Sequence, residues 1–348
     1  MCIRISLLLL LSLVFSCKET SLEKSFQIKT PTFDTFPINA SVRAIEVVDE
    51  LNMWFAAGEG MFGYTEDGGN SWTQDSIKIG DKPLEFRAIA ITEEAVFLLS
   101  TGSPAYLLRS ENKGQSWEEV YKEELPGTYY NSLKFWDKME GIAVGDPTES
   151  CLSVIITRDG GKTWKKVSCE SLPQAAEGEA GFAASNTNIA LRGDHVWLAT
   201  GGAKARIIHS ADKGRSWEVY DTPIIQGGQM TGIFSVDFLD EKNGIIFGGD
   251  WEKQDAQQKT KAITNDGGKT WRLVSNGDTP GFRSCVQYVP GSSGKGILAV
   301  GSPGISYSMD AGESWVNLND EGFYTIRIAD SGKAAWLAGK NRIMKMSW

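Results

Sequence analysis

Six acidic or amide side chains recur along the 348-residue chain in one octet pattern. Each octet opens with Ser or Thr, carries Asp or Asn two residues later, continues through Gly, and ends in Ser or Thr followed by Trp. Two carboxylates about 5–9 Å apart could act as the acid and base of a glycoside hydrolase, so these positions are the first candidates for chemistry. They are Asp67, Asn112, Asp159, Asp212, Asp266 and Asp310.

The other residue types of the octet favour a structural role for these six positions. Asp or Asn accepts hydrogen bonds from turn amides, Gly adopts the positive φ that other residues resist, and the Ser or Thr hydroxyl bonds back to the backbone. The Trp then buries a large ring between strands. We therefore expect each octet to be a turn clamp between two strands.

The spacing of the octets predicts the architecture. They lie 44 to 54 residues apart, which is the length of a four-stranded blade. Strands are expected at 42–47, 53–57, 61–64 and 71–77 around the first octet, and equivalent inner strands begin near Phe86, Tyr130, Phe182, Phe234, Phe282 and Tyr324. Seven inner strands predict an all-β, seven-bladed β-propeller of four-stranded antiparallel blades with Asp-box turns.

The seventh unit ends at Trp348 without an octet or a fourth strand. The segment Ser25–Thr30 alternates as a strand does and precedes the first blade. Pairing it with the last unit would close the ring and cover both sheet edges. The propeller is therefore expected to span residues 25–348.

The octet S/T-x-D-x-G-x-S/T-W resembles the Asp box of BNR-type propellers. The chain is most similar to the photosystem II stability and assembly-factor-like propellers, over about residues 25–348. This resemblance implies a non-catalytic scaffold that engages a partner through arginines on one face. Sialidases, xyloglucanases and sorting receptors carry the same box, so the motif is specific for architecture and not for activity.

The first residues predict export and lipidation. A charged start, an apolar run from Ile5 to Phe15 and a small residue before Cys17 indicate a signal peptide over 1–16. Val14–Cys17 resembles a bacterial lipobox, which implies a lipidated Cys17, a tether over 17–24, and a location in the cell envelope with the lipid as the sole membrane contact. An ordinary signal peptide with an incidental cysteine is the alternative.

Composition excludes several function classes. A formal net charge of −9 makes the chain a poor electrostatic partner for nucleic acid. Two histidines and no Cys-x-x-Cys pair give no metal-ligand spacing, and no Gly-rich strand-to-helix turn suggests a nucleotide cofactor. We expect neither a metal nor a cofactor.

Arginines and carboxylates are predicted to meet at one mouth of the central channel. Arg43, Arg87 and Arg283 occupy matching starts of inner strands, and the planar guanidinium forks of arginines suit an acidic peptide or a glycan carboxylate. Pairing of these arginines with carboxylates to hold adjacent blades is the alternative. The accompanying candidates on this face are Glu59, Asp146, Glu179, Asp250 and Trp251, the last in a long polar loop over 250–260.

The sequence therefore favours a binding or assembly lipoprotein that engages a protein partner or acidic ligand. A sialidase or glycoside hydrolase is the alternative function. Val42-Arg43-Ala44-Ile45 shares only the arginine with the sialidase F/Y-R-I-P motif, and Asp146 and Asp250 come from the third and fifth blades, too far apart for a catalytic pair.

Strand register predicts one disulfide. If Thr157 pairs near Trp164, partner numbers in this antiparallel ladder add to about 321, which places Cys169 opposite residue 152. Cys151 and Cys169 are then neighbours, and exported proteins meet an oxidising compartment. Cys285 is expected to stay free, and two unpaired thiols at positions 151 and 169 are the alternative.

Overall fold

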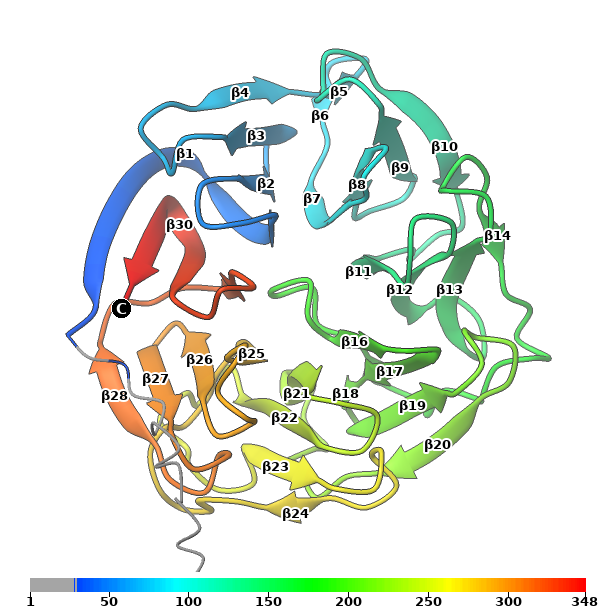
Figure 1. Cartoon of the computed structure of the whole chain (residues 1–348). Helices are drawn as coiled ribbons and strands as arrows, with labels where there is room; N and C mark the ends of the chain where they lie inside the picture. Colours follow the sequence, from blue (N-terminus) through cyan, green and yellow to red (C-terminus); the bar gives the residue numbers. More distant parts are fainter. Residues whose placement is uncertain (1–27, 29) are drawn as a thin grey trace, which may run out of the picture.

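The computed structural model describes Ile28 and residues 30–348, which form an all-β propeller with its sheets set around a common centre (Figure 1). The predicted all-β propeller architecture is thereby confirmed. No helix in these residues is long and apolar enough to cross a membrane. The strand pairs in the described residues are antiparallel, as expected for blades made of consecutive hairpins.

Four of the sheets have four strands. They are β7(Phe86–Ile91), β8(Val96–Ser100), β9(Ala105–Ser110) and β10(Glu118–Glu123); β11(Tyr130–Phe135), β12(Gly141–Pro147), β13(Leu152–Thr157) and β14(Lys165–Lys166); β16(Ile189–Arg192), β17(His195–Ala199), β19(Arg206–Ser210) and β20(Glu218–Asp221); and β25(Cys285–Tyr288), β26(Ile297–Gly301), β27(Gly304–Ser308) and β28(Val316–Asn319).

Two further sheets have six strands, and one ribbon has two. The first six-stranded sheet runs β15(Glu179–Ala180), β18(Gly201–Gly202), β21(Thr231–Phe238), β22(Gly244–Asp250), β23(Lys261–Thr264), β24(Arg272–Leu273). The second runs β29(Thr325–Ile328), β30(Ala334–Ser347), β1(Thr32–Val47), β2(Met53–Ala57), β3(Met61–Thr65), β4(Thr73–Ser76), and the ribbon is β5(Lys78–Ile79) with β6(Lys82–Pro83).

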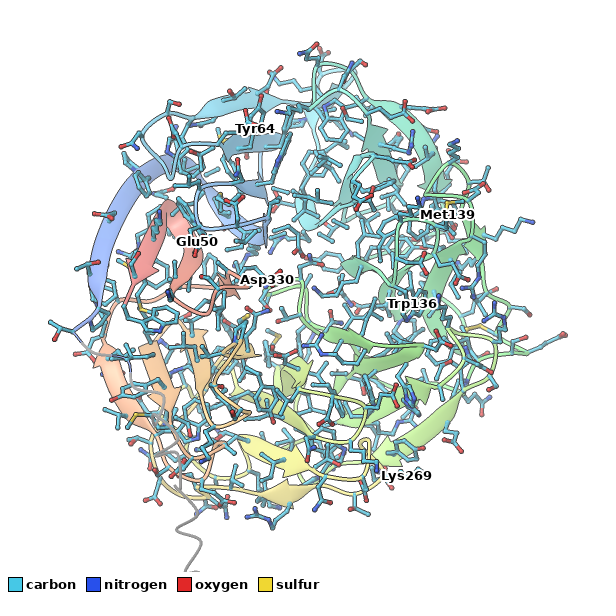
Figure 2. The ribbon with its side chains drawn as sticks, viewed as in Figure 1. Glu50, Tyr64, Trp136, Met139, Lys269 and Asp330 are labelled. Carbon is cyan, nitrogen blue, oxygen red and sulfur yellow. A yellow bond between two sulfur atoms is a disulfide. The ribbon has the colours of Figure 1, made fainter. Side chains whose placement is uncertain are left out.

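Neighbouring sheets pack through apolar and aromatic side chains, which fill the spaces between the ribbons in Figure 2. The whole of β8 is buried, as is the whole of β2. Trp197 of β17 stacks on Phe238 of β21 with ring centroids 3.7 Å apart, and Phe97 of β8 lies 4.7 Å from Phe135 of β11. Such contacts between consecutive sheets make the ring one continuous core.

The Asp boxes form the expected turn clamps. In the first box, Asp67 Oδ1 accepts from the Ser71 amide at 2.9 Å and Oδ2 accepts from the Ser71 hydroxyl at 2.6 Å. Thr65 Oγ1 accepts from the Gly69 amide at 2.9 Å and donates to Asp67 Oδ1. These hydrogen bonds, chiefly those from Ser71, hold the pKa of Asp67 at about 2. The carboxylate is thus engaged within its own turn.

The second box shows that the clamp does not need a charge. Asn112 Oδ1 accepts from the Ser116 amide at 3.0 Å, and its Nδ2 donates to the Ser116 hydroxyl at 2.8 Å. The Ser116 hydroxyl therefore accepts a hydrogen bond where the Ser71 hydroxyl donates one, and the turn keeps the same geometry. In the other four boxes, the hydroxyl of the residue directly before Trp donates to the carboxylate, as in the first box; these carboxylates are Asp159, Asp212, Asp266 and Asp310.

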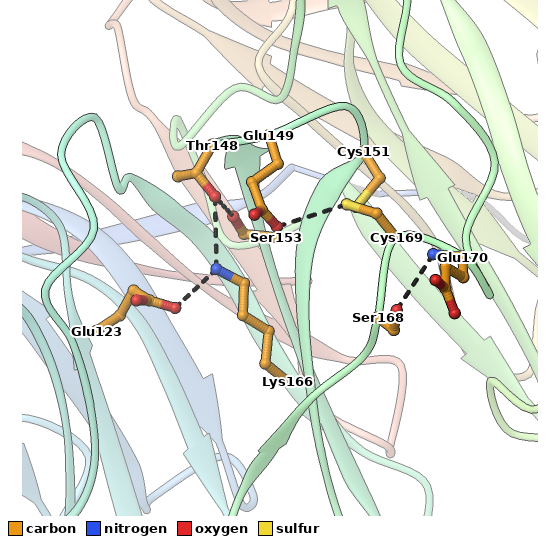
Figure 3. Close-up of a disulfide and its surroundings, with 9 residues drawn as sticks. All are labelled: Glu123, Thr148, Glu149, Cys151, Ser153, Lys166, Ser168, Cys169 and Glu170. Atoms are coloured by element: carbon orange, nitrogen blue, oxygen red, sulfur yellow. Dashed lines mark hydrogen bonds and ion pairs between the residues drawn. A yellow bond between two sulfur atoms is a disulfide. The ribbon is translucent and has the colours of Figure 1, made fainter.

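A disulfide joins Cys151 to Cys169 in the structure, with Cα atoms 5.4 Å apart (Figure 3). Ile155 pairs with Lys166 and Ile156 with Lys165, so partner numbers add to 321, as the strand register predicts. Cys285 is a free, buried thiol. Beside the disulfide, Lys166 Nζ of β14 donates to Glu123 Oε2 of β10 at 2.8 Å and so links two adjacent sheets.

Strand β1 joins the two ends of the described chain. Its first part, Thr32–Pro37, pairs with residues 342–347 of β30, and its last part pairs with β2. The sequence places this closing strand at Ser25–Thr30, most of which lies outside the described residues. In the described residues, the strand that pairs with the last unit begins at Thr32. Phe33 packs on the core of β25–β30 and Phe36 packs on the core of β1 and β2, so this segment supplies the buried apolar side chains of the seam.

The β1–β30 ladder generates a stability prediction. Phe36 packs on Trp72 and Trp336 with ring centroids 5.6 and 5.8 Å away. We expect Phe36→Ala to lower the free energy of unfolding by about 2–3 kcal/mol, because a half-buried aromatic ring is removed from the seam. Thr35→Ala, on the exposed side of the same strand, should change it by less than about 0.5 kcal/mol. Coincident denaturation curves for the two variants would contradict a packing role for the seam.

Candidate functional site

The two faces of the ring are distinguished by where the inner strands begin and end. We call the face on which they begin the strand-start face. The opposite Asp-box face holds the boxes and the turns between first and second strands; for example, the Gly68 amide of the first box donates to the Leu51 carbonyl of such a turn at 2.9 Å.

Four inner strands carry a β-bulge at an equivalent point near the strand-start face. The register shifts lie between Val42 and Ala44, and at the matching points of β7, β11 and β21. A bulge leaves one residue unpaired and re-aims its side chain. The bulged residues are Arg43, Arg87, Asn131 and Phe234.

Arg43 and Arg87 lie close enough to influence each other. The Arg43 guanidinium lies 3.9 Å from the centroid of the Tyr324 ring, and Arg87 Nη2 lies 3.0 Å from Glu85 Oε1. Burial lowers the pKa of Arg43, and the positive charge of Arg87 lowers it further. In the part of the chain that the structure describes, the buried Nε atoms of both arginines have no hydrogen-bond partner. The pair therefore has unused donors and only one adjacent carboxylate.

The structure does not bring Arg283 into this pair. Its side chain is buried, with Nη1 donating to the Phe282 carbonyl and Nη2 to Ser306 Oγ, both at 2.8 Å. Strand β25 pairs with β26 from Cys285 onward without a register shift, so Arg283 is one residue out of step with Arg43 and Arg87. Because strand side chains alternate between faces, that offset turns Arg283 away. The predicted convergence of three arginines is therefore wrong.

The predicted carboxylates are engaged elsewhere or exposed. Asp146 Oδ1 accepts from Asn131 Nδ2 and from the Gly181 amide, both at 2.9 Å, and burial raises the pKa of its carboxyl. Glu179 is buried and accepts from Thr200 Oγ1 at 2.7 Å and from Arg206 Nε at 3.0 Å.

Asp250 and Glu59 are the other two predicted carboxylates of the site. Asp250 Oδ1 accepts from the Glu252 amide at 2.9 Å, and Glu59 is exposed in a turn at a φ of 58°. Within residues 30–348, none of the four carboxylates pairs with the three predicted arginines. The blade-bridging alternative fails for the same reason, and Arg87 pairs instead with Glu85.

Aromatic side chains cover another part of the strand-start face. Phe182 stacks on Phe234 at 3.9 Å, Phe234 lies 4.7 Å from Phe282, and Trp251 lies 5.5 Å from Phe282. The Phe282 amide donates to the Gln254 carbonyl at 3.0 Å, which anchors the 250–260 loop against this cluster. Trp251 is half-buried there, so its ring serves packing within the fold.

A segment from the fourth unit closes the central channel. The sequence places an inner strand near Phe182, but β16 begins at Ile189, and the preceding residues 182–188 cross the middle of the ring, visible in green before β16 in Figure 1. We call residues 185–188 the plug. Its four side chains, Ser185, Asn186, Thr187 and Asn188, are all buried.

The plug bonds to inner strands around the ring. Asn186 Nδ2 donates to the Ile89 carbonyl at 2.8 Å, and its Oδ1 accepts from the Leu133 amide at 2.9 Å. The Val236 amide donates to the Thr187 carbonyl at 2.9 Å. Ser185 donates from Oγ to the Ser284 carbonyl at 2.7 Å, and its carbonyl accepts from Thr325 Oγ1 at 3.0 Å. These bonds replace the expected inner strand and separate the two mouths of the channel.

Several residues of the strand-start site and the plug were not identified from the sequence. Glu85 and Tyr324 each stand just before a strand, where no pattern distinguishes a site residue from a turn residue. The plug had a usable signal, because the polar run Ser185–Asn188 interrupts what would otherwise be an apolar inner strand.

The architecture and the boxes agree with comparisons to known proteins. The family model for the photosynthesis system II assembly factor YCF48 matches residues 29–134, and the BNR/Asp-box repeat model matches residues 155–166. The chain is thus similar to the YCF48 family over its first units and carries Asp boxes of the BNR type. The photosystem II assembly lipoprotein Ycf48 of Synechococcus sp. (strain CC9902) is 21% identical to it over 268 residues, covering 67% of this chain and 75% of the relative.

Solved Ycf48 structures share the fold of this Ycf48-like chain. One, YCF48 bound to D1 peptide, has a TM-score of 0.66 at 15% identity and covers 93% of this chain and 99% of its own. YCF48 from Cyanidioschyzon merolae has a TM-score of 0.64 at 13% identity and covers 90% and 98%. At such identities the likeness establishes the fold alone.

The plug generates a prediction. Asn186→Ala should lower the free energy of unfolding by about 2–4 kcal/mol, because it leaves the buried Leu133 amide and Ile89 carbonyl unpaired and places alanine at a φ of 58°. Asn265→Ala, exposed in a box, is the matched control and should shift stability by less than about 0.5 kcal/mol. Chemical denaturation measures both; equal stabilities would mean that the plug bonds do not hold the ring.

Proposed function

We propose that this chain is a non-catalytic binding and assembly protein that engages an acidic group of a protein partner at the strand-start mouth. The observation that carries the proposal is the half-buried Arg43–Arg87 pair, beside which the described residues place a single carboxylate, Glu85. Carboxylates accept paired hydrogen bonds from guanidinium groups, and a like-charged pair gains most from such a ligand.

The rest of the mouth supports recognition of a peptide. Tyr324 lies under Arg43, and Tyr129 is near enough to influence the pKa of that arginine, so two half-buried aromatic rings flank the charges. Rings of this kind are favoured at protein interfaces because one edge is apolar and the other polar. The solved Ycf48 structure with a bound D1 peptide has the same fold, which supports a peptide as the ligand class here.

We also propose that the ring has seven blades. The six-stranded sheet containing β1 then consists of two blades that share this strand. Its 16 residues pair with β30 at one end and β2 at the other, with a register shift between Pro37 and Ser41. Strand β30 passes through Asn341 at a φ of 61°, a turn conformation that divides it into two antiparallel arms. A blade count from a density map at side-chain resolution tests this proposal.

The arginine pair is tested with the double variant Arg43→Met/Arg87→Met. Fluorescence anisotropy with labelled acidic peptides should show affinity at least about tenfold weaker than for the unaltered protein, since charge-assisted hydrogen bonds contribute about 1.5–3 kcal/mol. Its melting temperature should not fall, because burial and mutual repulsion already oppose the two charges.

Two comparisons make that experiment decisive. Arg215→Met, which removes an exposed arginine on the Asp-box face, should bind acidic peptides as the unaltered protein does. Amidated peptides without acidic side chains should not bind. Retained affinity in the double variant, with its fold intact, would refute this site.

A lipid anchor at Cys17, with a signal peptide over 1–16, a tether over 17–24 and a place in the cell envelope, completes the proposal. It is supported by the curated Synechococcus relative, which is named as a lipoprotein. Cells expressing the full chain should incorporate labelled palmitate into it, and Cys17→Ser should abolish the incorporation while Cys285→Ser leaves it unchanged. If the Cys17→Ser chain is still labelled, Cys17 is not the lipidated residue and the proposed anchor is refuted.

A further inference from the structure

The plug forms the floor of a cavity at the other end of the channel, on the Asp-box face; we call this cavity the cup. The cup is a cavity of about 260 Å³ with Thr187 of the plug among its lining residues. Its walls come from the inner strands of the first six units, and its polar lining includes Glu46, Lys134, Arg192, Asp237 and Gln287. This cavity is separated from Arg43 and Arg87 by the plug.

Apart from Arg192, which ends β16, the charged residues of the cup occupy one ring of equivalent positions. Each is the next-to-last residue of an inner strand: Glu46 pairs with Trp54, Lys134 with Ile142 and Asp237 with Ile245. Gln287 and Arg327 hold the same position in β25 and β29. The blade repeat therefore brings these five side chains to a common depth in the channel.

The acceptor atoms of the ring are largely occupied. Glu46 Oε1 lies 3.4 Å from Asn186 Nδ2 and 3.6 Å from both Lys134 Nζ and Arg327 Nε. Asp237 Oδ1 accepts from the Phe238 amide and Arg192 Nη2, and Oδ2 accepts from the Tyr288 amide at 2.8 Å. Of these four carboxylate oxygens, Glu46 Oε2 alone makes no hydrogen bond or ion pair with the described residues.

Donors, in contrast, remain free. Among the described residues, Lys134 Nζ makes no hydrogen bond, and its closest carboxylate oxygen is the one 3.6 Å away on Glu46. Gln287 uses Oε1 to accept from the Ile328 amide at 3.0 Å, and its Nε2 makes no hydrogen bond within residues 30–348. The lining of the cup has two cations, Lys134 and Arg192, and two carboxylates, Glu46 and Asp237, and the buried Arg327 shares Glu46 with Lys134.

The Lys134 ammonium is poorly compensated. Its side chain is 23% exposed, and burial lowers its pKa, with a further lowering from Arg327 and Arg192 that Glu46 and Asp237 oppose. An anion placed beside it would add the missing acceptor, because Lys134 shares its nearest carboxylate, Glu46, with Arg327.

We propose that the cup is a binding site for a small oxyanion, a carboxylate or phosphate group, held by Lys134 Nζ and Gln287 Nε2 and attracted by Arg192. The cavity is smaller than typical drug-sized sites of about 300–1,000 Å³, so it admits a compact anion or the end group of a longer molecule. This site is independent of the arginine pair at the other mouth.

The test is isothermal titration of the full chain, purified in detergent, with acetate, succinate and phosphate at constant ionic strength set by chloride. Saturable binding of at least one of these anions, with a Kd in the millimolar range or tighter, is expected. Binding of the carboxylates alone identifies a carboxylate ligand, and binding of phosphate alone a phosphate ligand. Absence of saturation with all three overturns the proposal.

Three variants assign the binding to the cup. Lys134→Met should weaken it about tenfold or more, and so should Gln287→Glu, which keeps the size and the Oε1 acceptor but replaces the donor with a carboxylate. Lys138→Met removes an exposed lysine of the same face and should bind as the unaltered protein does. Thermal melts establish that each variant is folded. Unchanged affinity in both cup variants, or an equal loss in Lys138→Met, would overturn the assignment.

Discussion

Closure of the ring by backbone hydrogen bonds between β1 and β30 is the constraint on which the other features depend. A ring of sheets has a first and a last edge, and an open edge exposes unpaired amides and carbonyls to other chains. The ladder from Thr32 to Pro37 covers both edges. Only a closed ring gives the channel a fixed circumference, and only then can one plug segment reach inner strands on every side.

The plug shows how a repeat fold acquires a local function by breaking its own repeat. Most inner strands begin near the strand-start face, but the fourth unit enters the ring through Ser185–Asn188 and starts its strand later. Asn186 tolerates a left-handed backbone at this point because its amide bonds to two different strands. The result is two separate mouths with different chemistry: two neighbouring arginines that share one carboxylate at one end, and a mixed ring of charges with free donors at the other.

Sequence patterns predicted the features that arise from local chemistry. The boxes identified their turns, and the register around Thr157 and Trp164 was accurate enough to bring Cys151 to Cys169. Sequence patterns failed where an offset of one residue decides to which side of the sheet a side chain points. Arg283 follows Phe as Arg87 does, but only β7 has the bulge, and no residue type marks its absence in β25. Ser25–Thr30 alternates as a half-buried strand does, whereas Thr32–Pro37 does not, because Phe33 and Phe36 pack on cores on opposite sides of the sheet. Lys134, Asp237 and Gln287 are ordinary strand residues until the ring aligns them.

The pairing of Thr32 with Ser347 brings the two ends of the described propeller together at one point on the rim. Chains whose ends adjoin tolerate being linked there and reopened in an exposed loop. The turn at Gly80, which has open space around it and lies between the short strands β5 and β6, provides such a loop. A circular permutant opened at this turn would retain every blade contact, both mouths and the plug, because the order of units around a closed ring does not depend on which unit is synthesised first.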